Sequence, residues 1–388
     1  MKLKEILLGL FGGKTELKDS RYYEEQIDFS NVTDDNRLPK ILAYYLPQFH
    51  PIPENDKWHG IGFTEWTKVR QSAPLFKGHY QRHYPHDDIG HYIIDDNEIL
   101  KKQALMMKKS GVSGMVFYHY WFSGKLILEN PAQRVLGDKD IDMPFCFCWA
   151  NENWSRRWDG NEKEVLLKQD YSIDDAINFI KYLLPFFKDK RYININGRPV
   201  LIIYKPSYIK DINLYVQIWN DVLSENGLPS IYLVACISSD DFFDSNPYDC
   251  YLERPLYDWG GGNISDIKNK LSFLISKKCK VIEYKDVVDF YSNKEYLFDK
   301  SLWRSNVTCF DNTPRYGGDA YVTYGSNPEL FERWLYTLLV KSIKSKSEII
   351  VINAWNEWAE SAHLEPDKRF GYAYLNAVGR ALGRVKVQ

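Results

Sequence analysis

Two glutamates in the C-terminal part of the sequence have the type and spacing that acid–base chemistry needs. Glu357 and Glu360 lie three residues apart among tryptophans, shortly after the β-branched run 349–352, which is typical of a buried parallel strand. At a strand end or in a first helical turn, side chains at this spacing can face one cavity. Two neighbouring carboxylates among aromatic rings acquire different pKa values, so one keeps a proton as an acid while the other is ionised as a base. Cleavage of a glycosidic bond requires that division, and it is the chemistry we predict here.

Two other segments repeat this combination of a glutamate, a tryptophan and small or amide side chains. They are Gly62-Phe-Thr-Glu-Trp66 and Ala150-Asn-Glu-Asn-Trp154. Carboxylates and amides bind vicinal hydroxyls, and an indole ring covers the apolar face of a sugar. The whole sequence is rich in aromatic rings, with Trp 12, Tyr 28 and Phe 20. A sugar-binding pocket is the interpretation that these segments favour, and a structural polar network is the alternative.

The elements that must position these residues are eight short apolar runs, separated mostly by helical patterns. The runs predict strands at 40–46, 115–120, 144–149, 199–204, 231–236, 250–253, 303–310 and 349–354, and the patterns predict helices at 95–110, 172–187, 213–225, 264–276, 328–343 and 372–382. This alternation predicts a (β/α)8 TIM barrel, an α/β fold, in a single domain over residues 38–388 with long βα loops. A polar arm over residues 1–37 precedes it, and we expect this arm to be flexible. An open doubly wound sheet is the alternative, but no glycine-rich phosphate loop follows any of the runs.

A barrel of this kind gathers its functional residues just after the strands. Polar and aromatic clusters do follow most of the predicted strands, and the segment 48–95 is too long for an idle connection. We therefore predict Glu357 and Glu360 as catalytic. As substrate-binding residues we predict Tyr45, Gln48, His50, Glu65, Trp66, His119, Tyr120, Trp149, Asn151, Glu152, Trp154, Tyr204, Asp311, Arg315, Asn356 and Trp358.

The histidine-rich stretch within 48–95 contains side chains that could bind a metal ion. His79, His83 and His86, with Asp87, have ligand-type side chains, but their spacing matches no metal signature. We expect loop packing and ligand hydrogen bonding there, and we expect no metal and no cofactor. Arg156 and Arg157 suit either an anionic group or ion pairs with acids of the same loop. The six cysteines lie mostly in or beside apolar runs, which favours buried free thiols in a reducing compartment.

Charge and hydropathy limit the remaining classes of partner. The formal net charge of −2 favours neither nucleic acid nor an anionic membrane as the main partner. The apolar patch near Leu7 is too short to span a bilayer and lacks a small-residue cleavage site. We expect a cytoplasmic protein whose partner is an oligosaccharide or polysaccharide, with at most weak peripheral membrane contact through the arm.

Five segments taken in order resemble the WbsX-like family of bacterial polysaccharide-biosynthesis proteins. They are Tyr44-Tyr-Leu-Pro-Gln-Phe-His50, Gly62-Phe-Thr-Glu-Trp66, Trp149-Ala-Asn-Glu-Asn-Trp154, the segment 303–315 and Asn353-Ala-Trp-Asn-Glu-Trp-Ala-Glu360. The resemblance covers about residues 38–380. Members are commonly described as glycosyltransferases of O-antigen and capsule synthesis. That family in turn is similar to glycoside hydrolase family 99, the endo-α-mannosidases and endo-α-mannanases, which have a (β/α)8 barrel.

The family 99 motif Asn-Glu-Trp-x-Glu matches Asn356, Glu357, Trp358 and Glu360. The resemblance implies that Glu360 is the general acid/base. It implies that Glu357 deprotonates the 2-hydroxyl of the sugar, which attacks the anomeric carbon to give a 1,2-anhydro intermediate with net retention. Family 99 usually has His where this chain has Ala359, and Gly after the second Glu.

Three functions stay open at this point. The first is hydrolysis or transglycosylation at a glycosidic bond of a surface polysaccharide or its precursor. The second is glycosyl transfer from an activated sugar donor in O-antigen or lipopolysaccharide synthesis. The third is glycan binding without turnover. The sequence does not identify the sugar, the linkage or the oligomeric state.

Overall fold

A closed ring of parallel strands forms the centre of the protein. The computed structural model describes residues 18–28, 30, 37–156, 161–237, 247–255, 264–271, 278–296, 298 and 300–386. Within these residues the ring consists, in order, of β1 (Lys40–Tyr45), β2 (Gly114–Phe122), β4 (Phe145–Trp149), β8 (Arg198–Ile203), β9 (Tyr232–Ile237), β10 (Cys250–Glu253), β12 (Ser301–Asn306) and β14 (Ile349–Ile352). β1 pairs with β14 on one side and with β2 on the other, which closes the ring as no open sheet can. The predicted (β/α)8 barrel is confirmed.

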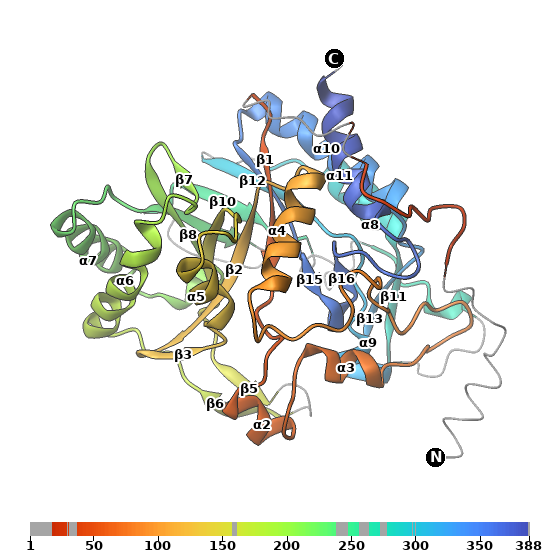
Figure 1. The fold of residues 1–388 in the computed structure, drawn as a ribbon, viewed down its shortest axis with the longest axis horizontal. Coiled ribbons are helices and arrows are strands. Elements are labelled where there is room, and N and C mark those ends of the chain that lie inside the picture. The colour runs from red at the N-terminus through yellow and green to blue at the C-terminus, as the bar shows by residue number, and fades with distance from the viewer. Residues whose placement is uncertain are drawn as a thin grey trace.

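Helices cover the outside of the barrel (Figure 1). The long ones are α4 (Glu98–Ser110), α5 (Asn130–Gly137), α6 (Ile173–Phe187), α7 (Ile212–Glu225), α8 (Tyr284–Asn293), α10 (Pro328–Ser345) and α11 (Ala373–Lys386). Ser172 caps the N-terminus of α6, because its hydroxyl accepts a hydrogen bond from the Asp175 amide at 3.2 Å. The helix predicted at 264–276 does not appear in the described part of that segment, where only a short 3-10 helix, Lys268–Lys270, is found. Residues 272–277 lie outside the described residues.

Short elements gather at the end of the barrel where the strands finish. They are α2 (Pro53–His59), α3 (Glu65–Gln71), α9 (Thr313–Tyr316), the 3-10 helices Pro206–Tyr208, Gly317–Asp319 and Trp358–Glu360, and the pairs β5 (Trp154–Arg156) with β6 (Asn161–Leu167), β11 (Lys280–Glu283) with β13 (Tyr321–Tyr324), and β15 (Asn356–Glu357) with β16 (Ala362–His363). Two further strands, β3 (Lys125–Ile127) and β7 (Asn194–Ile195), pair antiparallel with β2 and β8. Figure 1 shows α2, α3, α9, β5 and β6 together at its lower edge. The loops that follow β1, β4 and β12 therefore meet at one end of the barrel.

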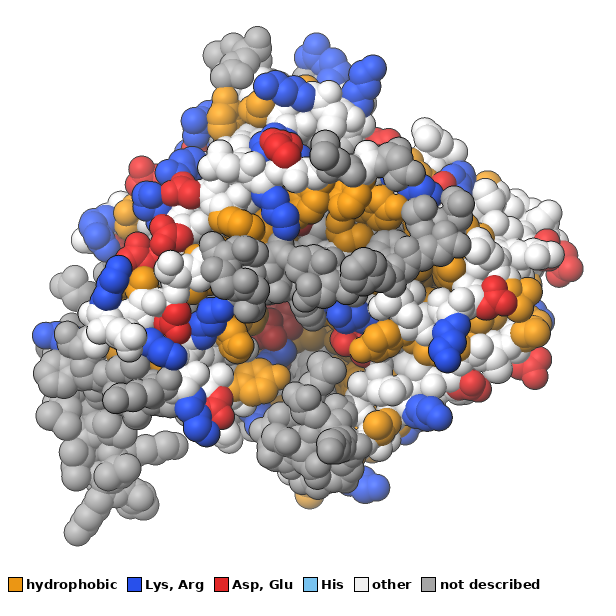
Figure 2. All heavy atoms as spheres, turned by 180° about the vertical axis from the view of Figure 1, so that it is seen from behind, with side chains coloured by type: hydrophobic (Ala, Val, Ile, Leu, Met, Phe, Trp, Pro, Cys, Tyr) orange, Lys and Arg blue, Asp and Glu red, His pale blue; other side chains and the backbone are white. Residues whose placement is uncertain are grey.

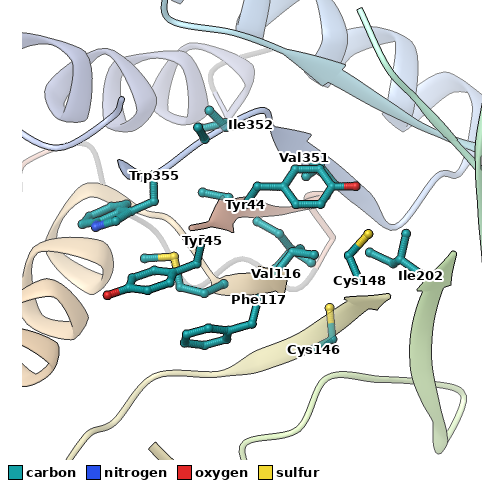
Figure 3. Close-up of a cluster of buried hydrophobic side chains, with 14 of the residues drawn as sticks. Tyr44, Tyr45, Val116, Phe117, Cys146, Cys148, Ile202, Val351, Ile352 and Trp355 are labelled. Carbon is teal, nitrogen blue, oxygen red and sulfur yellow. The ribbon is translucent and has the colours of Figure 1, made fainter. Parts of the chain in front are cut away.

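The barrel strands are apolar on both faces, because one face lines the interior and the other packs against helices. Tyr44 and Tyr45 leave β1 in opposite directions (Figure 3). The Tyr44 hydroxyl lies 3.4 Å from the Cys236 sulfur on β9, across the barrel. The Tyr45 hydroxyl donates to Gln103 on α4 at 2.8 Å, in the outer layer. This alternation decides which predicted residues reach the interior.

The described residues 18–28 pack against the C-terminal part of the chain. Glu24 forms a β-bridge with Gly371, and its carboxylate pairs with Arg380 at 2.8 Å. The Asp28 amide donates to the Asn376 side chain. The rest of the predicted arm, residues 1–17, 29 and 31–36, lies outside the described residues.

The cysteines, the surface charges and the hydropathy of the helices can each be compared with what the composition predicted. All six cysteines are free, five of them buried and Cys309 partly buried. On the face shown in Figure 2, Lys and Arg side chains alternate with Asp and Glu, in keeping with the net charge of −2. Among the described helices, none has both the length and the hydropathy to cross a membrane.

Candidate active site

A cavity of about 680 Å³ opens at the end of the barrel where the strands finish. Side chains from the segments after β1, β2, β4, β8, β10, β12 and β14 line it. The predicted residues among them are Gln48, Glu65, Tyr120, Glu152, Trp154, Tyr204, Arg315, Glu357 and Glu360. This volume accommodates one or more sugar rings.

The two predicted catalytic glutamates are held by an irregular segment after β14. The side chain of Asn356 bonds both backbone groups of Leu46, accepting from the amide at 2.8 Å and donating to the carbonyl at 3.1 Å. Asn356 and Glu357 then form β15, which pairs with β16, and Glu360 ends a 3-10 turn. Ser361 closes that turn with φ +54°, a conformation that favours glycine, and its hydroxyl accepts from Gln81 at 2.9 Å. The segment thus fixes both carboxylates at the mouth of the barrel.

One arginine bridges three carboxylates in this cavity. Arg315 donates to Glu360 at 2.6 Å through Nη1, and to Glu357 at 3.1 Å and Glu65 at 3.3 Å through Nη2. Glu65 also accepts the Ala359 amide at 2.7 Å, and its own amide donates to the Gln48 carbonyl at 2.9 Å. The first turn of α3 is therefore tied to the turn that carries Glu360.

Burial sets the electrostatics of the glutamate pair. It raises the pKa of Glu357 to about 8, and the neighbouring Glu360 carboxylate adds to that rise while Arg315 opposes it. Burial also raises the pKa of Glu360, again against Arg315. Because the two carboxyls repel each other when both are ionised, their titrations are coupled, and the pair favours one protonated and one ionised member. Such a pair supplies both an acid and a base.

Aromatic rings form one wall of the cavity. Trp154 packs edge-on against Tyr120, with ring centroids 5.2 Å apart, and against Trp58 on α2 at 5.9 Å. Deeper in the barrel, Tyr44 and Tyr118 stack at 4.9 Å with an interplanar angle of 13°. Flat rings beside carboxylates and amides are suited to pyranose faces.

A second cation lies deep in the same cavity. The Arg254 guanidinium stands over the Tyr204 ring, 3.7 Å from its centroid. Beside it, the buried Glu253 carboxylate accepts from the Tyr296 hydroxyl at 2.6 Å and from the Ser305 amide at 3.1 Å. The cavity therefore presents basic as well as acidic groups to a ligand.

Three predicted substrate-binding residues face the helices instead of the cavity. Tyr45 bonds Gln103 on α4, His119 stacks on Tyr182 of α6 with an interplanar angle of 7°, and Trp149 stacks on Phe179 of α6 at 4.5 Å. Each is the neighbour, one position along the strand, of an inward-facing residue. Successive strand side chains point to opposite faces, so a one-residue error moves a side chain out of the site.

The other predicted residues outside the cavity lining support its loops. They are His50, Trp66, Asn151, Asp311, Asn356 and Trp358, and all are buried. Asn151 accepts from the Lys205 amide and donates to its carbonyl, both at 2.8 Å, which joins the loops after β4 and β8. Trp66 and Trp358 pack against each other at 5.2 Å, behind the glutamates. The Asn151 amide therefore bonds backbone groups and the two indole rings pack on each other, so these side chains support the loops and do not line the sugar-sized cavity.

Several lining residues were not among the predicted ones: Tyr44, Asn55, Trp58, His59, Lys68, Tyr118, Glu253, Arg254, Tyr316, Tyr321 and Asn353. Strand alternation is the signal for Tyr118, which lies two residues before Tyr120 on β2, whereas Tyr44 lies on β1 and its direction follows only from the pairing of β1 with β2. Trp58 and Lys68 come from α2 and α3, inside the segment 48–95. The sequence predicted a function for this segment but did not single out these two residues.

The histidines considered for a metal do not share one centre. His79 bonds Asp311 at 2.6 Å, His86 pairs with Asp88 at 3.3 Å, and His83 faces His363 at 2.9 Å. The side chains of Arg156 and Arg157 lie outside the described residues.

The sequence of this chain resembles those of known proteins over most of its length. The family model described as Glycosyltransferase WbsX matches residues 41–378. The chain belongs to the WbsX glycosyltransferase family. Two relatives described as uncharacterized protein WxcX, both from Xanthomonas campestris pv. campestris, are each 35% identical, over 364 and 349 residues. The matches cover 92% and 89% of this chain but 52% and 50% of the relatives, so the chain spans about half their length.

Two solved structures share the fold of this chain. A glycoside hydrolase-like protein superposes with a TM-score of 0.59 at 12% identity, over 93% of this chain and 98% of that one. The GH99 endo-α-mannosidase from Bacteroides thetaiotaomicron gives a TM-score of 0.50 at 13% identity, over 89% and 97%. At these identities the likeness shows the fold alone. The family model confirms the predicted family.

Proposed function

We propose that this chain cleaves or transfers at a glycosidic bond of a bacterial surface polysaccharide or its oligosaccharide precursor, with retention of configuration. The observation that carries the proposal is the pair of buried carboxyls, Glu357 and Glu360, bridged by Arg315 in a sugar-sized cavity. The aromatic wall around Trp154 supplies a stacking surface beside them.

The reaction we propose proceeds in two steps. In the first, Glu357 takes the proton of the 2-hydroxyl, O2 attacks the anomeric carbon, and the bond from that carbon to the leaving oxygen breaks as Glu360 protonates that oxygen. In the second, Glu360 takes a proton from water or from an acceptor hydroxyl, which opens the 1,2-anhydro ring, and Glu357 returns its proton to O2. The configuration is inverted twice and so retained.

Arg315 gives this mechanism a further requirement. Its 2.6 Å contact favours an ionised Glu360, and burial raises the pKa of Glu357 to about 8, so before a ligand binds the proton of the pair belongs on Glu357. The first step needs the opposite arrangement, with Glu360 protonated and Glu357 ionised. Binding of the sugar must therefore loosen the contact between Arg315 and Glu360. Hydroxyls that enter between the two side chains provide the replacement hydrogen bonds.

Glycosyl transfer from an activated donor is the second candidate, and two observations favour it. The family bears the description of a glycosyltransferase, and the cavity contains the cations Arg254, Lys68 and Arg315 that an anionic leaving group needs. In that case a sugar nucleotide supplies the glycosyl group and a hydroxyl of the growing glycan accepts it.

The test is turnover, measured by mass spectrometry, with sugar nucleotides in one set of reactions and oligosaccharides in another. We expect Glu360→Gln and Glu357→Gln to lower turnover by about 10²- to 10⁴-fold with little change in ligand affinity. A good leaving group should partly rescue Glu360→Gln, because it needs no protonation, and should leave Glu357→Gln slow. The matched control is Glu54→Gln, on α2 and paired with Lys125, which should turn over like the parent. Parental turnover in both cavity variants would show that these glutamates only hold the ligand.

A further inference from the structure

A second cavity, of about 280 Å³, lies behind the turn that carries Glu360. At its wall, ligand-type atoms of His83, His363 and Asp367 come within 4.8 Å of one another. All three side chains are buried, with 6%, 3% and 2% of their surface exposed. We propose that these three residues form a binding site for a first-row divalent cation, most suitably Zn²⁺.

The orientation of His363 is that of a metal ligand. Its Nδ1 lies 2.9 Å from the Glu365 carbonyl oxygen, and because a carbonyl only accepts, Nδ1 carries the proton. Its Nε2 therefore presents a lone pair to the centre of the cluster. Histidines that bind metals almost always donate their other ring N–H to a carbonyl or carboxylate in this way. The Trp358 ring stacks on the imidazole at 3.7 Å and fixes its plane.

The Asp367 carboxylate has one oxygen whose burial the hydrogen bond between the two histidines does not explain. Its Oδ1 accepts two backbone amides, from Arg369 at 3.0 Å and Phe370 at 2.6 Å. Its Oδ2 is buried and has no hydrogen-bond partner among the described residues, although it lies 4.0 Å from His363 Nε2. A buried carboxylate oxygen without a partner is costly, and a cation at the cluster provides one.

The spacing of the cluster agrees with a small cation. Zn–N and Zn–O bonds of about 2.0–2.2 Å in a tetrahedron place ligand atoms roughly 3.3–3.5 Å apart. His83 Nδ1 and His363 Nε2 are 2.9 Å apart, Nε2 and Asp367 Oδ2 are 4.0 Å apart, and all three ligand atoms lie within 4.8 Å of one another, so side-chain shifts of about 1 Å suffice. The proton of His83 moves from Nδ1 to Nε2 when the ion binds, which leaves the ring neutral. The cavity has room for water as the fourth ligand.

The place of the site indicates its role. His363 lies on β16, which pairs with the strand that carries Glu357, and His83 comes from the segment between β1 and α4. An ion bound there joins these two parts of the chain, 280 positions apart, behind the catalytic turn. We assign it a structural role, so its test does not depend on the reaction proposed above.

The experiment uses the full chain, stripped with EDTA, dialysed, and titrated with ZnCl₂ by calorimetry and by thermal unfolding. We expect one Zn²⁺ per chain and a rise in Tm of about 3 °C at a hundredfold excess over Kd. Co²⁺ in its place should give the visible absorption of a tetrahedral nitrogen–oxygen site.

Asp367→Asn keeps the acceptor for the two amides but removes the charged ligand, so its affinity should fall by at least the roughly 10- to 100-fold that loss of an outer-shell partner costs. His86→Gln is the matched control, since His86 lies outside the cluster, and it should bind like the parent. Absence of a binding isotherm and of a Tm shift in the parent overturns the proposal. Equal binding by Asp367→Asn and His86→Gln also overturns it.

Discussion

Replacing Arg315 with glutamine tests whether one cation sets the charge state of the cavity. Arg315 is the bridge between Glu65, Glu357 and Glu360, at 3.3, 3.1 and 2.6 Å. Glutamine keeps part of the length and the polarity but carries no charge. The variant therefore leaves the three carboxyls together without their common partner.

The size of the effect follows from the geometry. Two unit charges about 4 Å apart at an effective dielectric constant of about 20 interact by roughly 4 kcal/mol. Removal of one partner of a buried ion pair costs about 3–5 kcal/mol. The Arg315 side chain is 28% exposed, so solvent screening places the expected loss of unfolding free energy near the lower figure, about 3 kcal/mol at pH 8.

The loss should depend on pH in a definite direction. The folded-state pKa values of Glu357 and Glu360 lie above the unfolded value, so the folded chain binds more protons than the unfolded chain. These carboxyls favour folding while protonated, and stability falls as pH rises from the unfolded pKa through the folded one. Loss of Arg315 raises both folded pKa values further and deepens that fall. At pH 5 protonation neutralises more of the charge on Glu357 and Glu360, so the cation matters less, and we expect a smaller loss of about 1 kcal/mol.

Thermal unfolding at pH 5 and pH 8 measures this without a known substrate. For a chain of this length 1 kcal/mol corresponds to roughly 1 °C, so Arg315→Gln should lower Tm by about 1 °C at pH 5 and about 3–4 °C at pH 8. Arg315→Lys keeps the charge and should lose less at pH 8. Arg333→Gln, whose partner Asp289 is 42% exposed, should lose under about 1 °C at both pH values. An equal loss at both pH values for Arg315→Gln refutes the electrostatic role.

Two further substitutions test other parts of the structure. Trp154→Ala should weaken oligosaccharide binding about 3- to 10-fold in a calorimetric titration, because a stacking face is lost. Trp154→Phe should retain most of the affinity. Equal affinity of the parent and both variants contradicts the stacking role. Gly371→Ala should lower Tm by about 2–4 °C and expose residues 18–28 to trypsin, because Gly371 has φ +59° and an added Cβ meets the Glu24 carbonyl. Gly227→Ala, with φ +70° and open space around it, should lose less, and equal losses would show that only backbone strain matters.

The barrel was predictable because its strands differ sharply from what surrounds them. Parallel barrel strands are covered on both faces and read as unbroken apolar runs, and the eight predicted runs overlap β1, β2, β4, β8, β9, β10, β12 and β14. Because both faces of such a strand are apolar, the sequence does not distinguish the side chains that face the barrel interior from those that face the helices. Tyr44 and Tyr45 look alike in sequence, but the first lines the cavity and the second bonds a helix. Only pairing across the barrel decides the phase.

The pocket predicted around Glu357 and Glu360 contains both glutamates, but the tryptophans next to them in the sequence do not line it. Trp355 and Trp358 suggested a pocket because indoles beside carboxylates suit sugars, yet both are fully buried. Their indole N–H groups donate to Glu365, at 3.1 and 2.7 Å. A buried carboxylate must be satisfied by donors, and these indoles supply two of them. The tryptophans therefore stabilise the turn from behind while Trp58 and Trp154, from two other loops, form the wall in front. Sequence spacing locates such a turn, but which of its rings faces the ligand depends on contacts between segments hundreds of residues apart.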